Sequence, residues 1–137
     1  CFHVSRRMVD GYRVFQAIPQ TELYRTAGEW LRQSSPPEAD IAYVEVGALA
    51  YYSRRPVRDL LGLVSPENLA FVESHDLAAA LHAHPTEYVV HHTRLAGFMD
   101  PVLREPWFAE HYEPVQSFEA RLSADVLTLY RRRQDSP

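Results

Sequence analysis

The sequence lacks the residue patterns on which most cofactor binding and covalent catalysis depend. Cys1 is its only cysteine, so no disulfide can form within the chain. Its five glycines are scattered, whereas a loop that holds a nucleotide phosphate needs clustered glycines to bring backbone amides close to the anion. None of the serines lies in the strand-to-helix pattern of a hydrolase nucleophile. We therefore expect no cofactor and no nucleophile-based catalysis in this chain.

Lysine and long apolar runs are also missing. All 14 basic residues are arginine, and with 18 acidic residues the net charge is −4, so no basic surface favours nucleic acid as a partner. The longest apolar stretch, residues 41–52, contains Glu45 and falls short of the roughly 20 residues that cross a bilayer. No signal-peptide pattern is present. The length of 137 residues then predicts one water-soluble domain that folds without a metal or disulfide.

The spacing of apolar residues predicts helices that alternate with strands. Leu23, Ala27 and Leu31 recur at helical spacing and predict a helix over residues 21–34, with Thr21 as its N-cap. Further helices are expected at residues 65–73 and 77–83, and strands at residues 41–46, 57–61, 87–92, 112–121 and 126–132. The residues between the first two strands are expected to form a loop. Residues 93–111 are also predicted as a loop, with one or two short helical turns.

This order of elements predicts the fold class. Helices and strands alternate early, and two strands joined by residues 123–125 form a hairpin at the end. We expect an α/β fold: a three-layer domain with a mixed, mostly parallel sheet, helices on both faces and a C-terminal antiparallel hairpin.

Four of the seven histidines occur as two close pairs, which makes a metal site worth testing. His82 and His84 are two residues apart in a predicted helix, so their side chains point about 200° apart. His91 and His92 are adjacent in a predicted strand and point to opposite faces of the sheet. Neither pair chelates a metal by itself, and no recognised ligand spacing joins the two pairs. The pattern predicts no metal site.

Two carboxylates interrupt the apolar strands, Glu45 in the first and Asp59 in the second. One interpretation pairs them with Arg54, Arg55 or Arg58, because buried charges persist chiefly when paired. The other places them in a crevice at the strand ends, where open α/β sheets bind ligands. Tyr51, Tyr52 and Trp107 would then offer aromatic faces on which a sugar stacks. These five residues are the candidate binding site.

Several motifs are similar to those of one enzyme family. Residues 46–53 read VGALAYYS, a glycine-tyrosine turn, and residues 56–67 read PVRDLLGLVSPE, with an Asp before a Gly-Leu pair and then a Ser-Pro helix start. Residues 85–90, PTEYVV, and residues 107–112 extend the similarity over most of residues 20–120. The pattern resembles the C-terminal soluble domain of polytopic glycosyltransferases of the GT-C superfamily, which includes bacterial relatives of protein mannosyltransferases and actinobacterial arabinofuranosyltransferases.

The resemblance implies an accessory domain of an enzyme that passes a sugar from a polyprenyl-phosphate carrier to an acceptor outside the membrane. The catalytic carboxylates of such enzymes lie in a loop that is absent here, so it implies no catalytic residue in this chain. Residues 1–19 would lead in from the membrane region, and residues 20–137 would form a single soluble, extracytoplasmic α/β domain. Its partners would be the membrane-embedded part of the same chain and a glycan or polysaccharide acceptor.

Two other interpretations stay open at this point. One is a stand-alone α/β metal-dependent hydrolase that uses His84 and His91 together with Asp59. The other is a protein-interaction module that binds no sugar. The first predicts bound metal and turnover by this polypeptide alone, and the second predicts neither.

Overall fold

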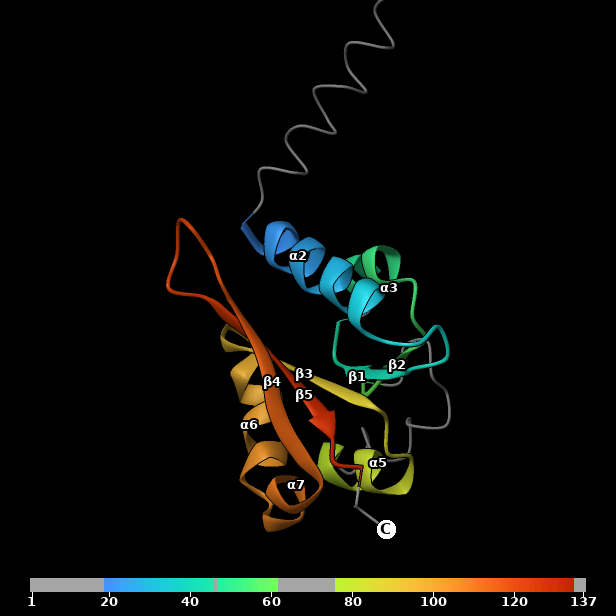
Figure 1. Cartoon of the computed structure of the whole chain (residues 1–137). Helices are drawn as coiled ribbons and strands as arrows, with labels where there is room; N and C mark the ends of the chain where they lie inside the picture. Colours follow the sequence, from blue (N-terminus) through green and yellow to red (C-terminus); the bar gives the residue numbers. More distant parts are fainter. Residues whose placement is uncertain (1–18, 46, 62–75, 135–137) are drawn as a thin grey trace, which may run out of the picture.

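The computed structural model describes residues 19–45, 47–61 and 76–134, which build a five-stranded sheet flanked by helices (Figure 1). The strands are β1 (Ile41–Tyr43), β2 (Val57–Asp59), β3 (Tyr88–His92), β4 (Tyr112–Glu119) and β5 (Val126–Arg132). Their order across the sheet is β2-β1-β3-β5-β4. β1 is parallel to both β2 and β3, whereas β5 is antiparallel to both β3 and β4.

The predicted α/β class and the mixed sheet are confirmed, but the expectation of a mostly parallel sheet is wrong. Two strand pairs are parallel and two are antiparallel. The reason is that the C-terminal hairpin, which is present as predicted, joins the sheet through its second strand. β5 therefore inserts beside β3 in the opposite direction and carries β4 to the sheet edge.

The helices are α2 (Pro19–Ser34), α3 (Gly47–Ser53), α5 (Leu77–Ala83), α6 (Ala96–Arg104) and α7 (Pro106–His111), with a short 3-10 turn at Thr93–Leu95. α2 begins before the predicted N-cap at Thr21, and it buries the predicted stripe of Leu23, Ala27 and Leu31. α5 has its predicted bounds, because the Asp76 carboxylate accepts a 2.8 Å hydrogen bond from the amide of Ala79. The helix predicted over residues 65–73 lies outside the described residues.

Two segments predicted as loops are helical. Tyr51 and Tyr52 belong to α3, and residues 93–111 form the 3-10 turn, α6 and α7. Both Gly97 and Pro101 lie inside α6, and proline removes one helical hydrogen bond. Met99 and Val102 nevertheless bury one face of that helix, so packing outweighs the lost bond.

Four of the five strands are shorter than predicted at one end, and β5 has its predicted bounds. β1 stops at Tyr43 rather than at residue 46, β2 stops at Asp59 rather than at residue 61, β3 starts at Tyr88 rather than at residue 87, and β4 stops at Glu119 rather than at residue 121. β1 ends early because the chain bends at Val44, and β2 ends early because the chain turns at Leu60–Leu61. Only three residues of each strand therefore remain in the parallel ladder.

α2 and α3 lie directly against each other (Figure 1). A Cβ atom added at Gly28 of α2 would lie 2.6 Å from the Cβ atom of Tyr52 and 2.9 Å from the backbone nitrogen of Ser53. Glycine at this position therefore allows a helix contact that any side chain would prevent. Among the helices of the described ranges, none combines the length and the apolar character needed to cross a bilayer.

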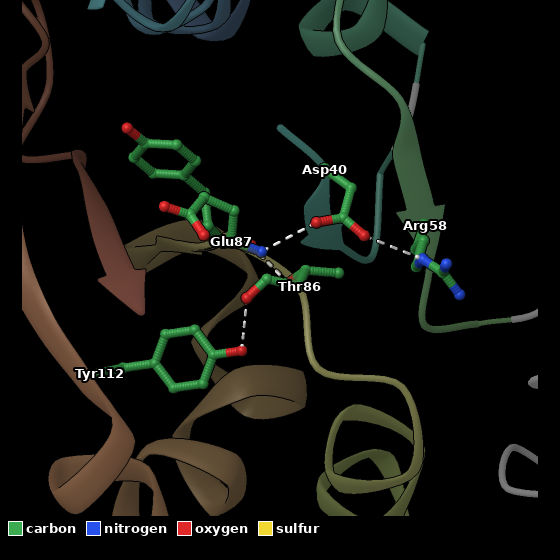
Figure 2. A network of polar contacts seen from close by, with 6 residues as sticks. Asp40, Arg58, Thr86, Glu87 and Tyr112 are labelled. Atoms are coloured by element: carbon green, nitrogen blue, oxygen red, sulfur yellow. Dashed lines mark hydrogen bonds and ion pairs between the residues drawn. The ribbon is translucent and has the colours of Figure 1, made fainter. Parts of the chain in front are cut away.

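Polar contacts tie the amino ends of three strands together (Figure 2). The Asp40 carboxylate, just before β1, accepts hydrogen bonds from the amide of Glu87 at 2.8 Å and from Nε of Arg58 at 3.2 Å. The hydroxyl of Tyr112, at the start of β4, donates to the carbonyl of Thr86 at 2.7 Å. These contacts pair a carboxylate with a cation and satisfy backbone groups, so they fix the register of the sheet at this edge.

Candidate functional site

At the opposite edge of the sheet, where the carboxyl ends of the parallel strands lie, the connections that follow β1 and β3 run in opposite directions across the sheet. β1 and β3 are parallel neighbours, and their carboxyl ends lie side by side. The chain leaves β1 through α3 to β2 on one side, and leaves β3 through α6 and α7 to β4 on the other side (Figure 1). Open α/β sheets bind ligands at such a switch in direction, outside the carboxyl ends of the strands. The residues that end β1 and β3 are therefore the first candidates for a site.

A polar cluster occupies this position and is centred on the hydroxyl of Tyr24 in α2. The hydroxyl lies 2.7 Å from Oε2 of Glu45, 2.9 Å from the hydroxyl of Tyr43 and 3.3 Å from Nδ1 of His92. Tyr24, Tyr43 and His92 are buried, whereas Glu45 is exposed. The rings of Tyr43 and His92 both meet the Tyr24 ring edge-on, with centroids 6.0 and 5.6 Å away. The buried hydroxyl of Tyr24 thus links two other buried side chains, those of Tyr43 and His92, to the exposed carboxylate of Glu45.

The direction of each hydrogen bond in the cluster follows from the number of protons that each side chain can donate. A carboxylate only accepts, so Tyr24 donates its single hydroxyl proton to Glu45. Tyr43 and Nδ1 of His92 must then donate to the Tyr24 oxygen. In a neutral His92 this assigns the proton to Nδ1 and leaves Nε2 as an acceptor. Nε2 is the buried side-chain atom without a hydrogen-bond partner in the described part of the chain.

Burial sets the protonation state of the cluster. Burial is the main cause that raises the pKa values of Tyr24 and Tyr43 well above the ordinary value for a phenol. It likewise lowers the pKa of His92 below the ordinary value for an imidazole, although Asp125 and Glu45 act in the opposite direction. At neutral pH both phenols keep their protons and His92 is neutral. The carboxylate of Glu45 is therefore the charged group that the cluster presents to solvent.

Asp59 lies at the same edge of the sheet as Glu45. It ends β2 opposite Tyr43, is fully buried, and accepts a 2.8 Å hydrogen bond from the amide of Leu61. Of the arginines expected as partners, Arg58 pairs with Asp40, and Arg55 donates to the carbonyl of Ser35, just after α2. The contact with Leu61 gives Asp59 a role in the turn that follows β2.

Tyr51 and Tyr52 belong to α3, which begins at Gly47, two positions after Glu45 at the same edge of the sheet. The Tyr51 side chain is 76% exposed, and its ring meets that of Tyr52 edge-on with centroids 5.0 Å apart. Tyr52 packs its Cβ atom against Gly28 of α2. Tyr51 is therefore the aromatic side chain of this pair that is available to a ligand, and Tyr52 is part of the helix contact.

Trp107 lies on a different part of the domain. It belongs to α7, which leads into the amino end of β4, and its ring centroid is 4.7 Å from those of both His82 and His111. It also lines a cavity of about 330 Å³ next to Glu105. The contact with His82 joins α7 to α5, so Trp107 helps to hold these two helices together. The structure does not bring it to Glu45.

The histidines do not gather into a metal site. His91 bonds to Asp100 of α6 at 2.8 Å, whereas the adjacent His92 contacts Tyr24 of α2. Within residues 19–45, 47–61 and 76–134, no three His, Cys, Asp or Glu side chains lie together as metal ligands. The set of His84, His91 and Asp59, which the hydrolase interpretation requires, falls in these ranges and is not assembled.

Comparison with known proteins gives a family but no function. The model of a family described as "Domain of unknown function (DUF8728)" matches residues 13–134. The chain belongs to this family. No curated protein and no solved structure matches it. For this DUF8728 domain, the side-chain geometry and the motif resemblance are the basis for a proposal about function.

Three residues of the cluster in this DUF8728 domain were not predicted from the sequence: Tyr24, Tyr43 and His92. A weak signal existed for each. Tyr24 adjoins the apolar stripe of its helix, and Tyr43 is the one side chain with a polar atom among the three residues of β1. His92 ends a strand, which is where ligand-binding residues of α/β sheets lie. Only the contact between Tyr24 and His92, which are 68 residues apart in the sequence, shows that residues of α2 and β3 belong to one cluster.

Proposed function

We propose that the chain is an extracytoplasmic accessory domain of a membrane glycosyltransferase that uses a polyprenyl-phosphate sugar donor. In this proposal the domain binds the glycan acceptor and holds it over the membrane-embedded active site of the same chain. The bond-forming residues belong to that membrane-embedded part. The motifs at residues 46–53 and 56–67, which resemble the corresponding domain of GT-C enzymes, support this assignment.

One observation carries the proposal: an exposed carboxylate, Glu45, is held by a buried phenol at the switch point between β1 and β3. Carboxylates that accept hydrogen bonds from hydroxyl groups, beside an exposed aromatic ring such as that of Tyr51, suit the recognition of a sugar. Hydrolysis is less well supported. The sequence has no nucleophile pattern, and the described residues contain no assembled set of metal ligands.

The position of the cluster agrees with the proposed attachment to a membrane region. Tyr24 lies near the start of α2, and residues 1–19 are proposed to lead in from that region. The hairpin between β4 and β5 reaches the same end, where Nε of Arg121 lies 3.5 Å from the carboxylate of Glu22 (Figure 1). The Glu45 cluster would then face the membrane-embedded part of the enzyme, where donor and acceptor meet.

We also propose the three-layer arrangement of the fold. Adjacent residues of a strand point to opposite faces of a sheet. His92 of β3 reaches Tyr24 of α2, whereas His91 reaches Asp100 of α6. These contacts support a sheet with α2 and α3 on one face and α6 on the other.

The test uses the longer protein that the proposal requires. The gene should encode several apolar segments of about 20 residues upstream of Cys1. In that membrane protein, Glu45→Gln should raise the acceptor KM about tenfold and leave the KM for the lipid-linked donor unchanged. Glu29→Gln, an equal change at an exposed position of α2, is the matched control. A gene without such segments, or a Glu45→Gln enzyme with the wild-type acceptor KM, would refute the proposal.

A further inference from the structure

The Glu45 cluster has a hydrogen-bonding polarity that restricts its ligand. We infer that it binds the hydroxyl groups of a neutral sugar and excludes the phosphate of the lipid carrier. This inference rests on the proposed function, because it assigns the cluster to the acceptor glycan and not to the phosphate end of the donor. Glu45 contacts the ligand, and Tyr24 is a positioning residue.

All the protons of the cluster point inward. Tyr43 and Nδ1 of His92 donate to the Tyr24 oxygen, and Tyr24 donates to Oε2 of Glu45. No donor in these four side chains is left for a ligand, and the outward-facing group is the carboxylate, which accepts only. A ligand that binds here must therefore bring its own donors. Sugar hydroxyls do so, whereas a phosphate brings acceptor oxygens and a negative charge that the carboxylate repels.

His92 keeps the Tyr24 proton directed at Glu45. If residue 92 presented an acceptor to Tyr24, the phenol would have two acceptors for one proton, and its bond to Glu45 would weaken. Nδ1–H of His92 removes that alternative, because it donates to the same oxygen. The arrangement leaves the buried Nε2 atom without a partner, which costs free energy in the folded state. A buried group that costs stability while it orients a surface carboxylate is characteristic of a functional site.

A bound cation is the alternative ligand for an exposed carboxylate. Divalent cations in proteins are usually held by several oxygen or nitrogen ligands. The part of the chain that the structure describes contains no three His, Cys, Asp or Glu side chains placed together so that they could hold a metal ion. The geometry therefore favours a neutral hydroxyl-bearing ligand over a metal ion, and magnesium serves as a probe in the test.

The test measures selectivity by NMR with the 137-residue chain, using separate titrations with neutral mannan and arabinan fragments, geranyl phosphate and MgCl2. We expect the sugar fragments to shift the backbone amide signals around Glu45 with a millimolar Kd, and the phosphate and magnesium to leave them unchanged. Glu45→Gln introduces an amide donor of the same shape, so it should weaken sugar binding about tenfold and allow geranyl phosphate to bind.

Two further variants separate positioning from folding. Tyr24→Phe should weaken sugar binding several-fold but still exclude phosphate, because the carboxylate remains while its orientation is lost. Glu29→Gln, at an exposed position of α2, should bind like the wild type. Shifts with geranyl phosphate or magnesium but not with sugar, or no shift with any probe up to tens of millimolar, would overturn the inference. The gene structure and the acceptor KM of the full membrane protein decide the proposed function separately.

Discussion

Replacing Tyr24 with phenylalanine removes one oxygen atom on which three hydrogen bonds depend. The contacts to Glu45, Tyr43 and His92 are lost together, and the ring itself keeps its edge-on packing. Glu45 is exposed, so water replaces the lost phenol there at little cost. Tyr43 and His92 are fully buried, so their donor groups lose the partner that the structure shows for them.

The expected cost follows from those two buried donors. A buried donor without a partner costs about 1–3 kcal/mol, and side-chain relaxation keeps the total below the simple sum. We therefore expect Tyr24→Phe to lower the free energy of unfolding by about 2–4 kcal/mol, a large share of the ~5–15 kcal/mol that is typical of a domain. Tyr51→Phe removes the same atom from a side chain that is 76% exposed, so it should change stability by less than ~0.5 kcal/mol.

Urea unfolding at pH 7 measures both variants, and an unchanged m-value confirms that the same surface unfolds. The double variant Tyr24→Phe/Tyr43→Phe supplies a further control. Once Tyr43 has no hydroxyl, only His92 is left with an unpaired donor, so the two changes together should cost about 1 kcal/mol less than their sum. Purely additive costs, or a Tyr24→Phe protein within 0.5 kcal/mol of the wild type, would show that the hydrogen bonds assigned to the cluster do not stabilise it.

Two further predictions concern pH and helix packing. Burial lowers the pKa of His92 in the folded state, so below about pH 6.5 the unfolded chain binds more protons at this residue than the folded chain does. The contribution of neutral His92 to the free energy of unfolding is therefore fully present above that pH and falls as the pH drops. NMR titration should find the pKa of His92 below the ordinary imidazole value of about 6.5, and a pKa at or above that value would contradict this. Gly28→Ala should cost about 1–3 kcal/mol in urea unfolding, because its Cβ meets α3, whereas Gly97→Ala, whose Cβ meets nothing within 4 Å, should be neutral or stabilising. Equal effects of the two alanine substitutions would contradict the close α2–α3 contact.

Elements with a strong local pattern could be predicted from the sequence. Leu23, Ala27 and Leu31 mark the buried face of α2, and Asp76 caps α5 at the predicted residue. The hairpin of β4 and β5 follows from two strand-like segments joined by a short turn. In each case the signal lies within a few residues of the element, so tertiary contacts are not needed to find it.

Elements whose stability comes from distant contacts were missed. α6 contains Pro101 and Gly97, which oppose a helix locally, but it is held by burial of Met99 and Val102 against the sheet. α3 has only seven residues, too few for a stable isolated helix, and it depends on its close contact with α2 at Gly28. The direction of the sheet was also misjudged, because sequence order does not show that β5 inserts beside β3.

The candidate site was predicted only where a charge interrupts an apolar strand. Glu45 and Asp59 give this signal, and both lie at the carboxyl edge of the parallel strands. Trp107 was grouped with them because aromatic residues suit sugar stacking, but its ring contacts His82 and His111 near the other edge. Residue type alone predicts chemistry, and the topology decides which residues meet.

The contrast between the two edges of the sheet is the strongest argument for the location of function. At the amino edge, Asp40 pairs with Arg58 and with the amide of Glu87, so both carboxylate oxygens have partners inside the fold (Figure 2). At the carboxyl edge, three buried side chains direct a single proton to the exposed Glu45, and a buried atom of His92 is left without a partner. An arrangement selected only for stability would resemble the first edge. The second costs stability and gains an oriented surface carboxylate, which benefits the protein only if something binds there.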